Sequence, residues 1–356
     1  MSLRKYLVWS LVVTAILAAA IVVYARFIRI PINVAYVSEE QGGISVINLN
    51  TLEVTKRVHP ADVAPRGLGI TVDGKYVVTA NKDTADASVF DTRGLRMVRR
   101  IKVGDNPEFI KLDPGGNSLF ASYEPSSSGG PPPQGPGGGE ADESGPSSQI
   151  VAFNVHDWSR VGDFVAGKET EGLEFSPDGK LLIVANEGQD TVGVYEVATG
   201  KLVREVNLVS YGKRPRGVKV SPQGNSYAVT MEGSGTLISL DQNFNVLRSV
   251  PTAARPYGVA FDREGRRIFV AASGAKELQV FAADTLQLLG ETAVGQRCWH
   301  FTFTPDDSKI LLACGRSNNV YVIDAKSYQT IRILGGFQLP WGIVTYPRSY
   351  GSLGLP

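Results

Sequence analysis

Seven residues whose side chains could bind a ligand recur along the chain, most of them at intervals of about 42 residues. In chain order they are Arg66, Glu108, Glu171, Arg216, Tyr257, Trp299 and Trp341. Arginine can pair with an anionic group and a tryptophan face can hold a planar one, so the set would suit a flat or amphipathic ligand. The same side chains could instead neutralise one another and cap the centre of the fold. The sequence leaves both interpretations open.

Beside Trp299, His300 is a candidate ligand for iron or a candidate base, although no second ligand stands at a spacing typical of a metal site. Three histidines and two cysteines are too few for a cysteine-rich zinc site or a multi-haem cytochrome. The chain also lacks G-x-S-x-G, Walker, H-E-x-x-H and EF-hand sequences, so no catalytic residue is predicted. These observations favour a non-catalytic protein and predict no cofactor.

The two cysteines could form a disulfide. Cys298 and Cys314 lie eight residues on either side of Asp306, the centre of a predicted hairpin turn. Residues opposite each other in an antiparallel hairpin have Cα atoms ~4.5 to 5.5 Å apart, which is within disulfide range. A slip of one residue in the strand register would separate them. The sequence therefore leaves open whether the two cysteines form a disulfide.

The elements that carry these residues are predicted from composition and repetition. Glycine, at 39 of 356 residues, indicates many tight turns between short strands and argues against a helical bundle. A net charge of +1 gives no electrostatic case for a nucleic acid partner. Each repeat of about 42 residues contains four strand-like runs, with turns such as Ser176-Pro177-Asp178-Gly179. Four short strands per repeat are typical of a propeller blade.

The seventh repeat is split between the two ends of the chain. Residues 341–346 supply its inner strand, and residues 33–58 supply the other three. Joining both ends in one blade leaves no free sheet edge. We therefore expect an all-β, seven-bladed β-propeller of four-stranded blades over residues 30–347, closed by a C-terminal inner strand in the N-terminal blade. Residues 348–356 are expected to form a C-terminal tail.

One repeat is longer than the others because it contains an insert, residues 125–147, composed mainly of Pro, Gly and Ser. Such a composition cannot bury a core, so it predicts a disordered loop between the second and third strands of one blade. Because strands alternate in direction, this loop should emerge on the face where the inner strands begin. It would then overhang the seven candidate positions.

The amino terminus has the composition of a membrane segment. Residues 6–24 carry no charge and would form a helix of ~28 Å, close to the ~30 Å hydrocarbon thickness of a bilayer. Residues 1–29 are therefore predicted to be a transmembrane anchor, with a cleaved signal peptide as the alternative. Under either interpretation, the chain after residue 29 is exported from the cytoplasm. The expected location is the cytoplasmic membrane, with a single pass and the propeller on the extracytoplasmic, periplasmic side.

The repeat units resemble one another most at the start of each inner strand. The segments are Pro65-Arg66-Gly67, Pro107-Glu108, Glu171-Gly172, Pro215-Arg216, Pro256-Tyr257-Gly258, Gly295-Gln296-Arg297-Cys298-Trp299 and Pro340-Trp341-Gly342. Over residues 33–346 the units resemble the YVTN-type seven-bladed propellers of surface-layer proteins. More narrowly, the segments are similar to propeller proteins associated with PQQ-dependent alcohol catabolism, and more distantly to the haem d1 propeller of cytochrome cd1 nitrite reductase. His300 stands where the narrower family usually has Gln, and the insert and the anchor are also departures.

This resemblance implies a membrane-anchored, non-catalytic propeller that binds a protein partner, at the face of the central funnel or within a membrane complex, in a redox or respiratory assembly. One alternative is a cofactor-handling protein of the haem d1 type that uses the funnel and His300. The other is an adhesion component of the cell surface, which rests on the YVTN resemblance alone.

Overall fold

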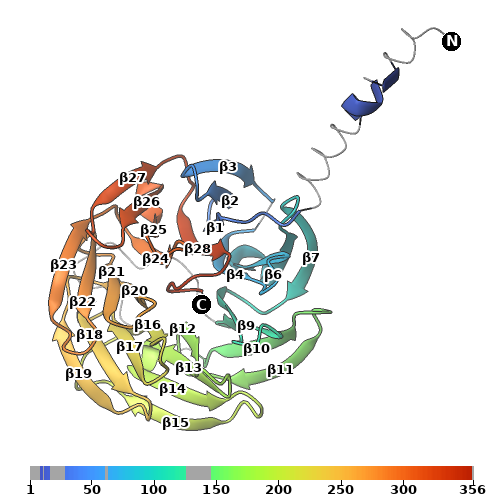
Figure 1. The fold of residues 1–356 in the computed structure, drawn as a ribbon. Coiled ribbons are helices and arrows are strands. Elements are labelled where there is room, and N and C mark those ends of the chain that lie inside the picture. The colour runs from blue at the N-terminus through green and yellow to red at the C-terminus, as the bar shows by residue number, and fades with distance from the viewer. Residues whose placement is uncertain (1–8, 11, 17–28, 61–62, 126–145, 355–356) are drawn as a thin grey trace.

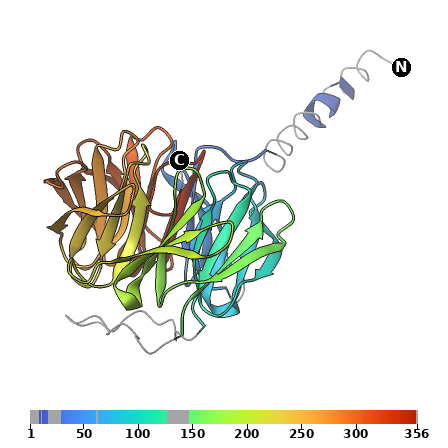
Figure 2. The same ribbon diagram turned by 90° about the horizontal axis from the view of Figure 1, so that it is seen from below.

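The computed structural model of the protein describes residues 9–10, 12–16, 29–60, 63–125 and 146–354. Seven four-stranded antiparallel sheets stand around a central axis as the blades of a propeller (Figure 1). Figure 2 shows the same ring of sheets from its edge. The predicted all-β, seven-bladed architecture is confirmed.

Each blade is a sheet whose first strand lies at the centre of the ring and whose fourth lies at the rim. From the centre outward, the first blade contains β28 (Pro340–Tyr346), β1 (Val34–Glu39), β2 (Gly43–Asn48) and β3 (Glu53–Val58). The second contains β4 (Pro65–Ile70), β5 (Tyr76–Asn81), β6 (Asp86–Asp91) and β7 (Arg96–Lys102). The third contains β8 (Pro107–Leu112), β9 (Ser118–Tyr123), β10 (Gln149–Asn154) and β11 (Arg160–Val165). The fourth contains β12 (Thr170–Phe175), β13 (Leu181–Asn186), β14 (Thr191–Glu196) and β15 (Leu202–Asn207).

The remaining three blades follow the same order. The fifth contains β16 (Pro215–Val220), β17 (Ser226–Met231), β18 (Thr236–Asp241) and β19 (Val246–Pro251). The sixth contains β20 (Pro256–Phe261), β21 (Arg267–Ala272), β22 (Glu277–Ala282) and β23 (Leu288–Ala293). The seventh contains β24 (Cys298–Phe303), β25 (Lys309–Cys314), β26 (Asn319–Asp324) and β27 (Thr330–Leu334). Short 3₁₀ turns follow three of the second strands, at η1 (Lys82–Thr84), η2 (Glu187–Gln189) and η3 (Gly315–Ser317).

The hairpins between first and second strands turn where the repeat predicted. The residue at each of these six turns has a φ between 56° and 71°, a left-handed conformation that favours glycine. Five of the six are glycines, so turn chemistry alone fixes most of these hairpins. The six are Gly74, Gly116, Gly179, Gly224, Gly265 and Asp307.

Burial increases from the rim of the ring to its centre. Every residue of the inner strand β12 is buried, whereas most of the outer strand β15 is exposed. The middle strands pack against neighbouring blades: Val89 of the second blade shares a core cluster with Ile110 and Leu119 of the third. Burial between blades, at ~25 cal/mol per Å² of apolar surface, is the main force that holds the blades together.

The ring is closed as predicted from the split repeat. Strand β28 pairs antiparallel with β1, so that Val34 lies opposite Tyr346 and Tyr36 opposite Val344. The N–H of Gly342 also donates a hydrogen bond to the Ser38 hydroxyl, 304 positions earlier in the chain. The two ends of the propeller sequence therefore complete a single blade.

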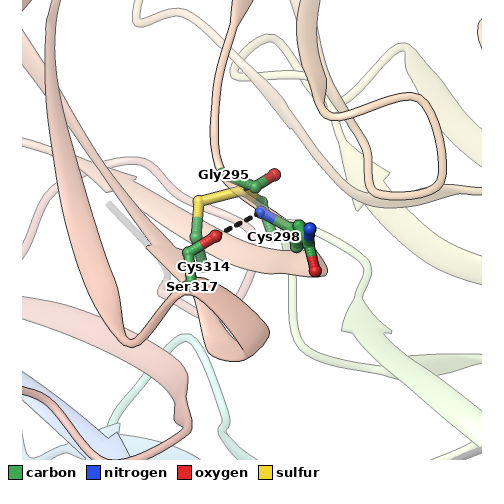
Figure 3. The surroundings of a disulfide bond; sticks show 5 residues. Gly295, Cys298, Cys314 and Ser317 are labelled. Atoms are coloured by element: carbon green, nitrogen blue, oxygen red, sulfur yellow. Dashed lines mark hydrogen bonds between the residues drawn. A yellow bond between two sulfur atoms is a disulfide. The ribbon is translucent and has the colours of Figure 1, made fainter.

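The first hairpin of the last blade carries a disulfide. Cys298 on β24 lies opposite Cys314 on β25, and their sulfur atoms are bonded (Figure 3). Both residues are buried. The register predicted from the position of Asp306 is confirmed.

The amino-terminal prediction falls mostly outside the described residues. Residues 9–10 and 12–16 are helical. No helix within the described ranges is both long and apolar enough to cross a membrane. The remainder of the predicted span at residues 6–24 lies outside the described part of the chain, so the anchor stays a prediction.

The predicted insert at 125–147 also lies largely outside the described residues. Its attachment points are described: Tyr123 at the end of β9 lies opposite both Pro107 and Gln149. The insert therefore connects β9 to β10 on the face where β8 begins, as predicted.

The residues after β28 pack into the centre of the ring, where the label C lies in Figure 1. Gly351 forms a β-bridge with Thr302, and the N–H of Ser352 donates to the carbonyl oxygen of Phe301 at 3.0 Å. Leu353 is buried among the core residues of the inner strands. Residues 348–354, which the sequence presented only as a tail, therefore line the central channel.

Candidate functional site

The seven candidate residues lie at one level, each as the second residue of an inner strand. We call them the ring residues, and we call the end of the channel where the inner strands begin the ring face. The structure brings all seven to this face, and each is between 2% and 9% exposed. The repeat therefore located a real constellation, which is nearly closed to solvent.

Close approach between inner strands fixes the positions of the ring residues. A glycine follows the ring residue in five of the seven blades. At Gly67, an added Cβ would lie 2.4 Å from the carbonyl oxygen of Glu108, and at Gly172 the same distance from that of Arg216. No larger residue fits there without moving a neighbouring strand. The two blades without this glycine have Phe109 and His300 instead.

Arg216 is the centre of the larger ion-pair network. Its guanidinium pairs with Glu171 at 2.9 Å, with Glu232 at 3.1 Å and also with Glu187. It donates a further hydrogen bond to the Tyr257 hydroxyl at 2.8 Å and lies 4.3 Å from the centre of that ring. Four neighbours on three blades therefore hold this side chain in one orientation.

A second network surrounds Arg66. Its guanidinium pairs with Glu108 on the next blade and with Glu40 at 3.2 Å. The ammonium of Lys82 lies 3.7 Å from the same Glu40 carboxylate. Charges at the ring face thus neutralise one another in buried pairs, as one of the two initial interpretations expected.

Several of these partners come from a second set of positions that the sequence analysis missed. Each residue of this set directly follows the second strand of its blade. The sequence contains a pattern that could have revealed this set, because four of the seven residues are glutamates that recur with the period of the repeat. The set comprises Glu40, Lys82, Glu124, Glu187, Glu232, Ser273 and Gly315.

Aromatic side chains meet beneath these charges. The ring of His300 lies 4.3 Å from that of Trp341, 5.2 Å from that of Tyr257 and 5.4 Å from that of Phe109, measured between centroids. Phe109 also contacts Trp341 edge to face. These four residues come from four blades, and their rings pack against one another at the centre of the propeller.

Trp299 packs against its own hairpin. An added Cβ at Gly315 would lie 1.8 Å from the indole, so only glycine leaves room for it. The guanidinium of Arg297 lies 5.6 Å from the indole centre and pairs with Glu232 at 3.5 Å. The indole is therefore a packed side chain next to the disulfide and the charged network.

Burial shifts the pKa values of several ring-face groups, among them Glu171 and His300. Burial raises the pKa of Glu171 to about 8, with the charges of Glu108 and Glu124 reinforcing and that of Arg216 opposing the shift. Burial, followed by the positive charge of Arg216, lowers the pKa of His300 below its usual range. In the described residues neither Oε2 of Glu171 nor Nε2 of His300 has a hydrogen-bond partner.

The described residues do not fit a haem ligated through His300. Its Nδ1 lies 3.1 Å from the Ser352 hydroxyl, and aromatic rings enclose the remainder of the imidazole. An iron atom could reach Nε2 only if these rings moved. The part of the chain that the structure describes also contains no group of three His, Cys, Asp or Glu residues placed to hold a metal ion.

Sequence comparisons give a partial match. A family model described as "Lactonase, 7-bladed beta-propeller" matches residues 154–255. This segment runs from the end of β10 to the loop before β20. A search of curated proteins gave no match.

Solved structures share the fold at low sequence identity. The periplasmic gluconolactonase PpgL of Pseudomonas aeruginosa is 18% identical with a TM-score of 0.71, over 90% of this chain and 99% of that one. A hydrazine synthase chain of Kuenenia stuttgartiensis is 20% identical with a TM-score of 0.67, over 80% and 89%. The dihydro-heme d1 dehydrogenase NirN, in complex with DHE, is 16% identical with a TM-score of 0.64, over 88% and 75%. At these identities the likeness shows the propeller fold.

Proposed function

We propose that this protein is a binding propeller whose ring face receives a protein partner, as a non-catalytic scaffold subunit of a redox or respiratory assembly. The observation that carries the proposal is the network around Arg216, which is held by the carboxyl groups of three glutamates and by the Tyr257 hydroxyl. Side chains fixed in this way lose little conformational freedom when a partner docks. The resemblance to the propellers associated with PQQ-dependent catabolism supports the redox context.

The proposed location is the cytoplasmic membrane, with the propeller on the extracytoplasmic side. The uncharged stretch at residues 6–24 supports an anchor, and the bond between Cys298 and Cys314 supports an oxidising compartment. Membrane fractionation of the full chain tests this. Retention in the membrane after alkaline washing supports the anchor, whereas a mature amino terminus near residue 26 would show a cleaved signal peptide.

Arg216→Ala tests the ring face as a binding surface. Tagged wild-type and variant proteins are used to capture partners from native membranes, and chemical denaturation of each measures folding. Arg248→Ala, on an exposed position of the outer strand of the same blade, is the matched control. We expect folded Arg216→Ala to lose a partner that wild type and Arg248→Ala retain. Undiminished capture by folded Arg216→Ala would reject this surface.

A second candidate function is hydrolysis of a lactone. Its support is the Glu171 carboxyl, because a group with a pKa of about 8 can exchange a proton near neutral pH, as a general acid or base must. The partial match to a lactonase family model supplies the substrate class. The test is hydrolysis of a panel of sugar lactones by wild type and Glu171→Gln. A rate equal to that without protein would eliminate the idea.

The haem d1 alternative is supported by the distant sequence resemblance to the haem d1 propeller and by structural likeness to NirN. The enclosure of His300 argues against it. The visible absorption spectrum of protein purified from its native source, followed by titration with haem d1, decides the point. A bound chromophore that is lost in His300→Gln would revive this alternative.

A further inference from the structure

The other end of the channel contains a fully buried group of charges, which is independent of the ring face. Lys111 on β8, Glu174 on β12 and Lys219 on β16 come from three consecutive blades and are at most 1% exposed. Each lysine Nζ lies 3.2 Å from an oxygen of the Glu174 carboxylate. We call these three residues the lysine triad.

Within the described residues, which end at Gly354, the lysine triad is not electrically balanced. It holds two ammonium groups against one carboxylate, and no other acidic side chain in the described residues pairs with either lysine. The other acceptors are backbone carbonyl oxygens, those of Leu353 at 3.5 Å from Lys111 and of Gly354 beside Lys219. Neutral carbonyls solvate a charge without cancelling it. A buried excess of one positive charge is costly unless an anion accompanies it.

The acidity of Lys111 reflects the same imbalance. Burial lowers the pKa of its ammonium to about 7, with Lys219 on β16 adding to the shift and Glu174 on β12 opposing it. Arg348 of the C-terminal segment, whose pKa burial also lowers, lines a small pocket with Lys111 at this end of the channel. Near neutral pH the protein thus relieves part of the excess charge by losing a proton.

A larger pocket lies beside Lys219. Its volume is about 170 Å³, enough for a compact organic molecule and well above the ~30 Å³ of one water. Its walls are mainly apolar and come from three blades and the C-terminal segment, with Pro114, Phe175, Val220, Pro222 and Tyr350 among them. Among the residues that line it, Lys219 is the one lysine, and no arginine is present.

We propose that this pocket binds a small monocarboxylate with a compact apolar body. The apolar body would lie against Phe175, Val220 and Tyr350, and the carboxylate would supply the negative charge that the lysine triad lacks. Burying an apolar group and completing an ion pair at the same time gives selectivity against both neutral analogues and bare inorganic anions.

Benzoate is the probe for this site, with benzamide and inorganic phosphate as the comparison ligands. Benzamide has nearly the same shape without the charge, and phosphate has the charge without the apolar body. Benzoate is expected to raise the melting temperature saturably, as binding to the native state alone requires, while the other two have little effect at equal concentration and ionic strength. An equal response to benzoate and benzamide, or to benzoate and phosphate, would overturn the proposal.

Two variants locate the site. Lys219→Met is expected to weaken benzoate binding about tenfold or more, through loss of a charge-assisted contact. Lys180→Met, an exposed lysine of the fourth blade, is the control and should bind as wild type does. If Lys219→Met does not fold, Val220→Trp fills the pocket without changing the lysine triad and should remove the response. Wild-type affinity in folded Val220→Trp would reject the pocket.

Proton uptake distinguishes this site from a surface anion site. Calorimetric titration with benzoate at pH 7, in buffers with different ionisation enthalpies, should show uptake of up to about half a proton, because the bound carboxylate stabilises protonated Lys111. The uptake should vanish at pH 5.5, where Lys111 is already protonated. It should also vanish in Lys111→Met. Benzoate binding without proton uptake in wild type would contradict the role of the lysine triad.

Discussion

Glu171 is a carboxyl that the fold keeps protonated, and this has a measurable effect on stability. Burial raises its pKa to about 8 in the folded chain, whereas the ordinary pKa of a glutamate is 4.5. Between these two values the unfolded state has lost the proton and the folded state retains it, so stability falls as pH rises from about 4.5 to about 8. Above pH 8 this contribution becomes constant.

Glu171→Gln should remove that pH dependence, because glutamine resembles the protonated carboxyl. The variant is expected to become progressively more stable relative to wild type as pH is raised from 5 to 8. Urea denaturation at several pH values measures the difference. Glu205→Gln, at an exposed position on the outer strand of the same blade, is the control and should follow wild type throughout. A wild-type slope in Glu171→Gln would mean that Glu171 is ionised in the folded protein.

Trp299 has the contacts of a packing residue. Trp299→Ala should cost about 3 to 5 kcal/mol in the free energy of unfolding, as truncation of a buried aromatic does. Gly315→Ala should also destabilise, because its Cβ would collide with the indole. If both variants unfold as wild type does, the indole is not packed as described, and a role as an exposed ligand platform would regain support.

The sequence alone predicted the positions of some functional residues but not the contacts of others. The ring residues were predictable because the repeat fixes one position per blade, and the cysteines because a turn fixes hairpin register. The carboxylates of Glu187 and Glu232 recur with the same period, but pairing with Arg216 depends on how far each blade is rotated against the next. The lysine triad occupies the fifth position of three consecutive inner strands, so the repeat aligns its residues too, but contact between their side chains is a tertiary property that the repeat does not fix.

At the scale of the strand, the disulfide ties β24 to β25 next to the ring face. The bond joins cysteines 16 residues apart, and closing a loop of that size restricts the unfolded chain by about 3 kcal/mol. Cys298→Ala combined with Cys314→Ala should therefore lower the free energy of unfolding by about that amount. Thiol titration of unfolded wild type should find no free thiol before reduction and two after it. Two thiols before reduction would show that the bond is absent from the isolated protein.

Strands and turns were the most predictable level of structure, and the chain ends were the least. Glycine turns at a fixed offset specify each hairpin without reference to the rest of the molecule. Residues 348–354 have no repeat and no turn signature, and their backbone finds its partners in the assembled channel, among them Phe301 and Phe303. Sequence reasoning therefore described as a tail a segment that the whole ring is needed to position.

At the scale of the molecule, the pairing of β28 with β1 makes the stability of the ring cooperative. Deletion of residues 339–356 removes the inner strand of the first blade and exposes the edge of β1. We expect the truncated protein to lose the thermal transition of the whole propeller rather than that of one blade. A transition of full amplitude in the truncated protein would show that closure is not required. A truncation at residue 354 is the control, since it keeps every described contact.

The same closure means that the two strands that join the ends of the ring are synthesised at different times. A ribosome produces β1 almost at the start of the propeller and β28 at its end, so β1 waits for its partner while six complete blades are synthesised. During that interval the chain is an open arc with an unpaired strand edge, a state that invites pairing with other chains. Rapid release of the last residues, or a chaperone that covers β1, would therefore govern the yield of soluble protein more strongly than the stability of the finished ring.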